Sequence, residues 1–280
     1  MDLSGNKTVL VIGLAKSGCA AATALAERGV KVIATDIKDD PAIKQQATVL
    51  AAKGVHVILG RHPLELLTAV DLVVVSPGVP DSAPLIVEAK RQRIPIISEP
   101  ELAYRLYPGP YLAVTGSNGK TTTTTWVGEA LTAGGIAAVV AGNIGRPLTE
   151  AVSGLTPGKW VVAELSSFQL QYSDQFHPRA STILNLSEDH LDRHGSFAAY
   201  RAAKARIFAR QTKDDILVLN ADDQYSAELA AVAPSTVVFF SRRQILTQGA
   251  WVEDDYLTIG WEGEQSVLCR IEDVAIPGAH

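Results

Sequence analysis

Short, continuous runs of apolar residues alternate with helical patterns along the first hundred residues. Two stretches between the runs, residues 17–29 and 41–54, have a helical composition and end at glycine, which commonly stops a helix. The apolar runs are rich in branched side chains and do not alternate with polar residues, which is typical of strands buried on both faces of a parallel sheet. The repeated order of strand, helix and strand predicts a doubly wound parallel sheet. Its predicted strands are residues 8–13, 31–36, 56–60, 71–78 and 94–98.

A second unit of the same kind follows the sequence YPGP at residues 107–110, which marks a hinge. Residues 198–211 are predicted to be helical. From about residue 236 the pattern changes to the shorter pieces TVVFFS, AWVEDDYLTIGW and SVLCRIEDVAI, which predict a small antiparallel extension. We therefore expect an α/β protein with a Rossmann-like parallel-sheet domain at residues 1–107 and a second α/β domain at residues 108–280. The predicted strands of the second domain are residues 111–116, 137–143, 160–165, 180–186 and 215–220.

The composition is that of an ordinary globular protein, with 47% hydrophobic and 20% charged residues. The net charge of −5 argues against a nucleic-acid partner, which requires a basic face. No apolar run approaches the roughly 18 residues that span a bilayer, and the N-terminus carries no basic leader. We therefore expect a cytoplasmic protein with no membrane partner. Cys19 and Cys269 have no metal-binding spacing and are expected to be small hydrophobic residues in a reduced compartment.

The sequence YLAVTGSNGKTTTTTW, from residue 111, places a predicted strand, a glycine-rich turn, Lys-Thr and a helix in succession. This order is typical of loops that hold phosphates, because backbone N–H groups and the helix N-terminus supply partial positive charge. Lys120 adds a full charge, and the hydroxyl of Thr121 can hold Mg²⁺. Val114 stands where the first glycine of the longer loop is expected, so the turn must be tighter. We predict a P-loop ATPase-like second domain. Its ATP-binding residues are Gly116, Ser117, Asn118, Gly119, Lys120, Thr121 and Thr122.

Candidate metal ligands follow two strands of this domain, at the edge where ligands bind in parallel sheets. Glu164 ends the run WVVAEL, and beside a phosphate loop its expected task is to bind Mg²⁺; the alternative is a surface glutamate. Residues 185–195, NLSEDHLDRHG, concentrate acidic residues and histidines, and His190 is a competent ligand for a divalent ion. The alternative there is a solvated acidic loop. His190 and His194 have the spacing of a zinc pair but lack a convincing third ligand.

Three further positions carry less specific signals. GNIG at residues 142–145, which contains Asn143, and SPG at residues 76–78 are polar turns after predicted strands. Lys204 lies among alanines in a predicted helix, where most lysines are solvated. Its ammonium group would repel Mg²⁺, so Lys204 could enter a metal site only after carboxylation by CO₂ to an anionic ligand.

The turn at residues 13–18 is similar to a dinucleotide-binding fingerprint. Gly13 and Gly18 are in place and Asp36 ends the next strand, but the middle glycine, which lets the backbone approach a pyrophosphate, is Ala15. This substitution and the second phosphate loop downstream disfavour a nicotinamide cofactor. The turn could still hold a sugar nucleotide or another phosphorylated ligand.

Five motifs, TGSNGKTTTT, GNIG, ELSSFQL, LNLSEDHLDRH and YRAAKARI, occur in the order of the Mur ligase family, which the chain resembles. The pair ELSSFQL and EDHLDRH is most similar to the branch that couples D-glutamate to UDP-N-acetylmuramoyl-L-alanine, rather than to folylpolyglutamate synthases. The resemblance implies a three-domain enzyme whose first domain binds the uridine nucleotide and whose second binds ATP and Mg²⁺. The family continues beyond PGAH with a third domain that contacts D-glutamate. We therefore expect this chain to be a fragment that is incomplete for catalysis.

The resemblance also implies roles for single residues. Lys120 would contact the β- and γ-phosphates, and Thr121 and Glu164 would bind one Mg²⁺. His190 and a carbamylated Lys204 would bind a second Mg²⁺. The implied uridine-nucleotide pocket consists of Lys16, Ser17, Asp36, Ile37, Ser76, Pro77 and Gly78, and further substrate contacts come from Asn143, Ser166 and Gln169.

The implied reaction joins two anions. The alanyl carboxylate attacks the γ-phosphate of ATP to give an acyl phosphate, and the amine of D-glutamate then displaces phosphate, so cations must offset the repulsion between the reactants. The family implies a monomer whose partners are small molecules. Three alternatives remain: a ligase of another branch, including one that acts on folate, a nicotinamide-dependent dehydrogenase, and a nucleotide-binding module without catalysis.

Overall fold

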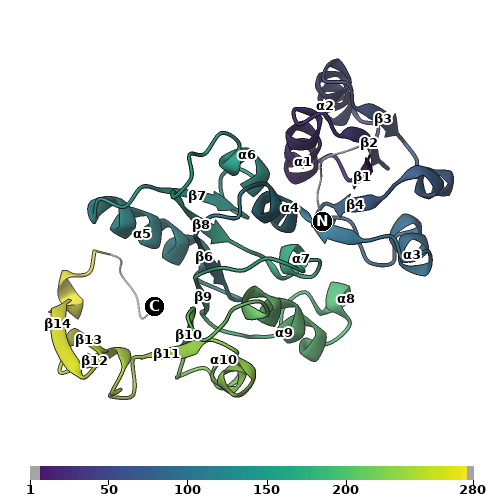
Figure 1. The fold of residues 1–280 in the computed structure, drawn as a ribbon. Helices are drawn as coiled ribbons and strands as arrows, with labels where there is room; N and C mark the ends of the chain where they lie inside the picture. Colours follow the sequence, from purple (N-terminus) through teal and green to yellow (C-terminus); the bar gives the residue numbers. More distant parts are fainter. Residues whose placement is uncertain (1–6, 276–280) are drawn as a thin grey trace.

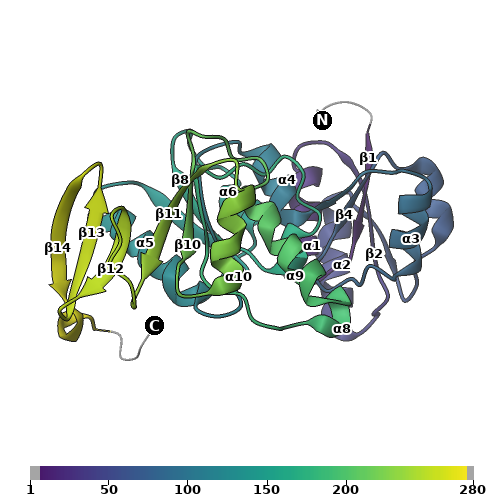
Figure 2. The ribbon, with the colours of Figure 1, turned by 90° about the horizontal axis from the view of Figure 1, so that it is seen from below.

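The structure is a computed structural model of the chain and describes residues 7–275. It contains one sheet of five strands and one of nine, each accompanied by helices (Figure 1). The two units lie side by side, the first coloured purple to blue and the second teal to yellow. Figure 2 shows that the last three strands, in yellow, lie at the end of the molecule far from the first sheet.

The first sheet is parallel and covered on both faces. Its elements are β1 (Thr8–Ile12), α1 (Lys16–Ala26), β2 (Lys31–Asp36), α2 (Pro41–Ala52), β3 (His56–Leu59), the 3₁₀ helix η1 (Leu64–Ala69), β4 (Leu72–Val75), α3 (Pro84–Arg91), β5 (Ile96–Ser98) and α4 (Glu99–Leu106), and the strand order is β3-β2-β1-β4-β5. Val9 and Val11 of β1 pack with α1, α2 and α4, whereas Leu10 and Ile12 pack with α3 and η1. Burial on both faces explains the continuous apolar runs. The predicted doubly wound sheet is confirmed.

The second sheet contains both parallel and antiparallel strands, in the order β14-β13-β12-β11-β10-β9-β6-β8-β7. Its elements are β6 (Tyr111–Thr115), α5 (Lys120–Ala133), β7 (Ala138–Gly142), α6 (Leu148–Val152), β8 (Trp160–Glu164), α7 (Ser167–Leu170), β9 (Ala180–Ile183), α8 (Leu191–His194), α9 (Phe197–Ala205), η2 (Arg206–Phe208), β10 (Ile216–Asn220), α10 (Gln224–Ala227), η3 (Glu228–Val232), β11 (Thr236–Ser241), β12 (Gly249–Glu253), β13 (Tyr256–Trp261), β14 (Glu264–Arg270) and η4 (Ile271–Asp273). Tyr111 and Ala113 of β6 share a core with α6 and α9. On the other face, α5 packs so closely that a Cβ on Gly128 would lie 2.3 Å from the Val140 side chain.

The antiparallel extension is confirmed for β12, β13 and β14, which pair antiparallel with one another. The assignment of TVVFFS to that extension was wrong. These residues form β11, which pairs parallel with β10 on one side and with β12 on the other. The extension is therefore a continuation of the same sheet, because β11 provides the edge to which the last strands attach.

The predicted helix at residues 198–211 is shorter in the structure. The α-helix α9 ends at Ala205 and continues only as the 3₁₀ turn η2. Gln211 is buried, and its side-chain amide donates hydrogen bonds to the carbonyl oxygens of Pro178 and Ile216 at 3.1 and 3.0 Å. These tertiary bonds fix Gln211 against β9 and β10, which a continued helix would prevent.

Helix α4 joins the cores of the two sheets. Leu102 packs in the core of the first sheet, whereas Ala103 and Tyr107 pack in the core of the second. Tyr107 belongs to the expected hinge, yet it is buried and its hydroxyl donates a hydrogen bond to Lys159 O at 2.8 Å. The domain boundary between residues 107 and 108 stays a prediction.

Within residues 7–275, no helix is both long and apolar enough to cross a bilayer.

Candidate functional site

The loop at residues 116–119 connects β6 to α5 at the carboxyl edge of the parallel strands. Gly119 has φ of +81°, a left-handed conformation that favours glycine, and Lys120 directly after it begins α5. The unpaired N–H groups of the first helical turn therefore lie at the loop. The structure has the predicted succession of strand, tight turn and helix.

Hydrogen bonds from two other segments brace this loop. The Ser117 hydroxyl lies 2.9 Å from the Tyr200 hydroxyl on α9 and accepts a hydrogen bond from Ser187 N at 3.0 Å. Asn118 N donates to Asn185 Oδ1 at 2.9 Å, and Asn185 Nδ2 donates back to Asn118 O at 3.1 Å. Ser117 and Asn118 thus shape the loop. Sequence reasoning missed Tyr200 and Asn185, although both lie inside the motifs that carried the resemblance.

Glu164 lies beside the start of α5. Parallel pairing places Glu164 next to Val114 of β6 and Gly142 of β7, so the residues that follow these strands share one edge. The carboxylate is buried; Oε2 accepts a hydrogen bond from Thr121 Oγ1 at 2.9 Å, and Oε1 accepts one from Asn143 Nδ2 at 2.8 Å. The structure therefore brings together three of the predicted residues, Thr121, Asn143 and Glu164.

Two lysine side chains reach the loop at residues 116–119, the predicted phosphate loop. Lys120 Nζ donates to Gly116 O at 3.0 Å and to Ser117 O at 2.9 Å. Lys204 Nζ donates to the same Gly116 O at 2.7 Å and lies 4.7 Å from the centre of the Tyr200 ring. Burial lowers the pKa of Lys204 to about 7, and the charge of Lys120 acts in the same direction. Lys204 is thus a buried group at the loop and not a solvated lysine.

His190 and His194 flank the ring of Phe168, which belongs to α7. The ring centre of His190 is 5.0 Å from that of Phe168, and its Nε2 lies 3.5 Å from Asp189 Oδ2. His194 stacks on Phe168 at 4.9 Å, and its Nε2 lies 2.9 Å from the Ser167 hydroxyl. Among the described residues, His190 makes no hydrogen bond or ion pair with Glu164 or Lys204. The structure therefore brings Lys204, but not His190, into contact with the phosphate loop.

Ser166 and Gln169 hold each other at the start of α7. The Ser166 hydroxyl accepts a hydrogen bond from Gln169 N at 3.3 Å, and Gln169 Oε1 accepts one from Ser166 N at 3.0 Å. This reciprocal pair is a capping box, which satisfies the free N–H groups of the helix. Thr122 lies exposed in the first turn of α5. Substrate contacts by Ser166 and Gln169 stay a prediction.

All seven residues predicted for the uridine-nucleotide pocket line one cavity of about 810 Å³ in the first unit. Inside it, Asp36 Oδ2 accepts a hydrogen bond from Leu14 N at 2.6 Å, and Ser76 Oγ donates one to Gly13 O at 2.7 Å. A Cβ on Gly18 would lie 1.7 Å from Gly13 O, so α1 starts too close to the turn for any other residue. The residues brought together are Lys16, Ser17, Asp36, Ile37, Ser76, Pro77 and Gly78.

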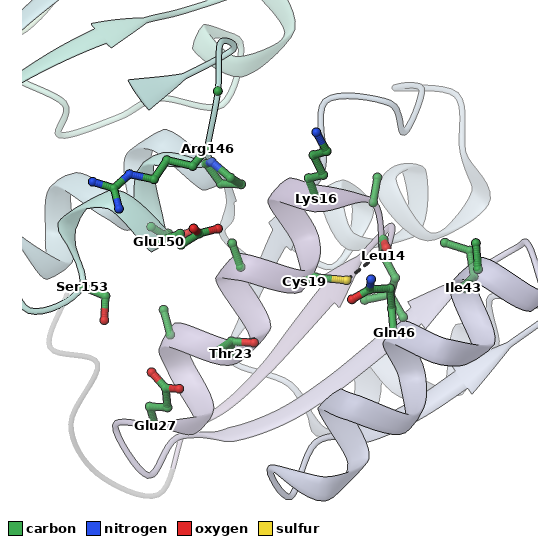
Figure 3. A pocket seen from close by; sticks show the side chains of 17 residues that line it. Leu14, Lys16, Cys19, Thr23, Glu27, Ile43, Gln46, Arg146, Glu150 and Ser153 are labelled. Carbon is green, nitrogen blue, oxygen red and sulfur yellow. Dashed lines mark hydrogen bonds between the residues drawn. The ribbon is translucent and has the colours of Figure 1, made fainter. Parts of the chain in front are cut away.

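A second cavity, of about 860 Å³, lies between α1, α2 and the segment that leads into α6 (Figure 3). Lys16 lines both cavities. In Figure 3, Cys19 points toward Leu14, and its Sγ donates a hydrogen bond to Leu14 O at 3.1 Å. Burial raises the pKa of the Cys19 thiol to about 11, so the thiol is protonated at pH 7. Arg146 belongs to the facing wall. Lys16 and Gly145, from the predicted turns at residues 13–18 and 142–145, line this cavity, but no ligand was predicted for it.

Arg193 of α8 links the edge that carries Glu164 to the first unit. Its Nη2 donates hydrogen bonds to Pro77 O at 3.3 Å and to Val79 O at 3.2 Å. Its guanidinium lies 4.6 Å from the centre of the Phe168 ring, a cation–π distance. Arg193 thereby holds the loop at residues 76–79 beside α7. Sequence reasoning missed this role, because no local pattern shows which carbonyl groups an arginine will reach.

Both parts of the chain match sequence profiles of known protein families. A sequence profile described as "Mur ligase middle domain" matches residues 114–273, more than half of the chain. A second profile, described as "Mur ligase MurD-like, N-terminal domain", matches residues 7–98. The chain belongs to the Mur ligase family. The resemblance seen in the motifs is therefore confirmed.

Curated relatives of this Mur ligase chain include two named UDP-N-acetylmuramoylalanine--D-glutamate ligase. The protein from Geobacillus kaustophilus is 45% identical over 276 residues, which cover 98% of this chain and 60% of the relative. The protein from Koribacter versatilis is 42% identical over 281 residues, which cover 100% of this chain and 62% of the relative. The chain thus spans about 60% of the length of the curated relatives it matches.

Solved Mur ligases share the fold. The UDP-N-acetylmuramate:L-alanyl-gamma-D-glutamyl-meso-diaminopimelate ligase of Neisseria meningitidis aligns with a TM-score of 0.60 at 20% identity, over 93% of this chain and 86% of that one. The UDP-N-acetylmuramate-alanine ligase of Thermotoga maritima aligns with a TM-score of 0.53 at 23% identity, over 99% of this chain and 62% of that one. At these identities the match describes the fold alone.

Proposed function

We propose that this Mur ligase chain belongs to an ATP- and Mg²⁺-dependent enzyme that adds D-glutamate to UDP-N-acetylmuramoyl-L-alanine during peptidoglycan synthesis. The names of the relatives at 42–45% identity support this substrate choice. The observation that carries the proposal is the hydrogen-bonded group of Thr121, Asn143 and Glu164 at the phosphate loop. The proposal includes a cytoplasmic monomer whose partners are the small-molecule substrates.

The side chains at the phosphate loop fit a nucleotide-bound Mg²⁺. This hard cation prefers oxygen ligands and usually binds through one or two protein groups together with water and substrate phosphates. Thr121 Oγ1 and a carboxylate oxygen of Glu164 lie 2.9 Å apart and would hold it. Among residues 7–275, no cluster of three or more His, Cys, Asp or Glu side chains could hold a metal alone. The bound ion would neutralise charge on the triphosphate.

The residues of the chain would let two anions meet. The alanyl carboxylate attacks the γ-phosphorus, the bond to the β-phosphate oxygen breaks, and the D-glutamate amine then displaces phosphate to form the amide. Lys120, which now contacts two loop carbonyl groups, would donate to phosphate oxygens and stabilise charge in the transition state. Asn143 would orient Glu164 from the substrate side.

Lys204 is proposed to act as a carbamate. CO₂ reacts with a neutral amine: a bond forms between Nζ and the carbon, and one proton leaves. Burial lowers the pKa of Lys204 to about 7, so an appreciable fraction of the amine is neutral at that pH. The product is an anionic oxygen ligand, which would hold a second Mg²⁺ together with His190.

Turnover and binding assays test the proposal. We expect ADP release to require UDP-N-acetylmuramoyl-L-alanine, and the amide product to form with D-glutamate but not with L-glutamate. ADP release that depended on a folate substrate would assign the protein to the other branch of amide ligases. Tight NADH binding without ATP binding would replace the ligase by a dehydrogenase.

A further inference from the structure

His62 lies in the cavity of the first unit, although no motif pointed to it. It follows β3 and lines the cavity together with Asp36, Ile37 and Lys38. Its side chain is half-buried. The cavity therefore includes a ring nitrogen donor or acceptor whose chemistry the proposed function does not yet use.

The topology places His62 at the base end of this cavity. In a parallel sheet with this connectivity, phosphates bind at the first helix N-terminus, here Lys16 and Ser17, and the sugar binds near the end of the second strand. β3 is the next strand outward, with Leu59 paired to Asp36. Ile37 is 60% exposed and offers an apolar surface beside it. A nucleotide with its phosphates at α1 would thus direct its base toward Ile37 and His62.

Hydrogen bonding to Thr35 fixes the tautomer of His62. Thr35 Oγ1 lies 2.8 Å from Arg61 O and 3.0 Å from His62 Nδ1. The hydroxyl has one hydrogen, and the carbonyl oxygen of Arg61 can only accept it. The same hydroxyl must therefore accept from His62 Nδ1–H, which leaves a lone pair on Nε2. Among residues 7–275, no side chain or backbone group donates to Nε2.

The charge state agrees with this tautomer. Burial lowers the pKa of His62 below its usual range, and this effect exceeds that of the Asp36 carboxylate, which acts in the opposite direction. The ring is therefore neutral at pH 7, and Nε2 accepts hydrogen bonds rather than donating them.

We propose that His62 is a specificity-determining residue that selects a base with a ring N–H, such as uracil, against cytosine. Uracil carries a hydrogen on N3, which Nε2 can accept. Cytosine has a lone pair at N3, which would face the lone pair of Nε2. This inference rests on the proposed function, since it assumes that the cavity binds the uridine nucleotide.

The test measures the dissociation constants of UDP and CDP for the 280-residue chain by calorimetry at pH 7.5. We expect the wild type to bind UDP about tenfold more tightly than CDP, since one such hydrogen bond contributes up to about 1.4 kcal/mol. In His62→Ala the ratio should fall to less than about threefold. His62→Gln should bind both nucleotides, because its amide can present either a donor or an acceptor. His56→Ala, at an exposed position at the start of β3 outside the cavity, is the matched control.

The outcomes distinguish the role of His62 from the nucleotide pocket itself. A wild type that prefers UDP, with the preference retained in His62→Ala, would overturn the role of His62 alone. Equal weakening of UDP binding and CDP binding in His62→Ala would also overturn that role. It would indicate that His62 packs against the nucleotide or contacts its ribose. A wild type that binds no UDP would instead refute the proposed nucleotide pocket. Thermal unfolding of each variant verifies that the comparison is made on folded protein.

Discussion

Lys120 and Lys204 approach the carbonyl oxygen of Gly116 from two different helices. Two ammonium groups at one carbonyl oxygen repel each other, and this repulsion adds to burial in lowering the pKa of Lys204. The repulsion can be relieved by a bound anion or by loss of one charge. A triphosphate would provide the first and carbamate formation the second, so both proposed roles follow from the same local electrostatics.

Replacing Lys120 by alanine removes the ammonium group that contacts the carbonyl oxygens of both Gly116 and Ser117. We expect Lys120→Ala to reduce acyl-phosphate formation by at least about 10³-fold, because the charge that builds on the transferred phosphoryl group loses its stabilising cation. The measurement is chemical trapping of the acyl phosphate in the full-length enzyme. Lys213→Ala, which removes an exposed lysine, is the control. Near-normal turnover in Lys120→Ala would refute the assignment.

Carbamate formation on Lys204 should make activity depend on CO₂. Depletion of bicarbonate is expected to lower turnover, and its return should restore it, because the free amine cannot serve as an anionic ligand. Isotopically labelled bicarbonate should give a carbamate carbonyl signal in NMR spectra, and Lys204→Arg should lack it. A ligand-bound structure with an unmodified Lys204 side chain directed away from the metal would refute the proposed carbamate.

At the scale of elements, a buried carboxylate fixes α4 to the turn after α7. Glu101 is 0% exposed and accepts hydrogen bonds from the backbone N–H groups of Asp174, Gln175 and Phe176 at 2.9–3.0 Å. Arg105, one turn later on α4, neutralises it with an Nε–Oε1 distance of 2.7 Å. A buried charge with this many donors holds the two segments in one arrangement.

Loss of this carboxylate should be strongly destabilising. Glu101→Ala removes the acceptor of three backbone N–H groups and leaves the buried Arg105 guanidinium with only the more distant Asp174 carboxylate, at 3.8 Å, so we expect a loss of about 3 kcal/mol in the free energy of unfolding. Urea unfolding measures this loss. Glu27→Ala, which removes an exposed ion pair with Lys53, should change stability by less than about 1 kcal/mol. Similar losses in both variants would show that the Glu101 contacts contribute little.

At the scale of the whole molecule, the two units meet around α4 and α6, next to each other in both views (Figures 1 and 2). Glu99, the first residue of α4, is buried there, and its Oε1 accepts hydrogen bonds from Thr149 N and Oγ1 of α6 at 2.6 Å each. Within the described part of the chain its Oε2 has no hydrogen-bond partner. Another hydrogen bond also joins the two units: the hydroxyl of Tyr172, in the second unit, donates to the carboxylate of Asp81, in the first.

This buried carboxyl group makes stability depend on pH. Burial raises the pKa of Glu99 to about 7 despite the Thr149 hydrogen bonds, so the folded state binds a proton that the unfolded state releases above about pH 4.5. Its contribution is fully present below that pH and is lost as pH rises through about 7. We expect wild type to lose on the order of 2 kcal/mol more than Glu99→Gln between pH 5 and 8. Glu129→Gln, at an exposed position of α5, should behave as wild type. Equal losses in wild type and Glu99→Gln in urea unfolding would contradict this.

The sequence by itself determined the features that depend on neighbours along the chain. Continuous apolar runs gave the parallel strands, because a strand buried on both faces has no polar face. The order of strand, glycine turn, Lys120 and Thr121 indicated the phosphate loop, since all of its parts are contiguous. Glu164 and Lys204 were predicted as site residues because each lies in a recognisable local motif.

The tertiary structure alone decided what depends on partners far along the chain. β11 was assigned to the wrong part of the sheet because strand direction is set by the paired neighbour, which a local pattern does not contain. Asn185 braces the phosphate loop across 67 positions of sequence. His62 comes to line the cavity proposed to bind the nucleotide because β3 pairs beside β2. In each case the deciding contact joins residues that are far apart in the sequence. No pattern of neighbouring residues can therefore reveal it.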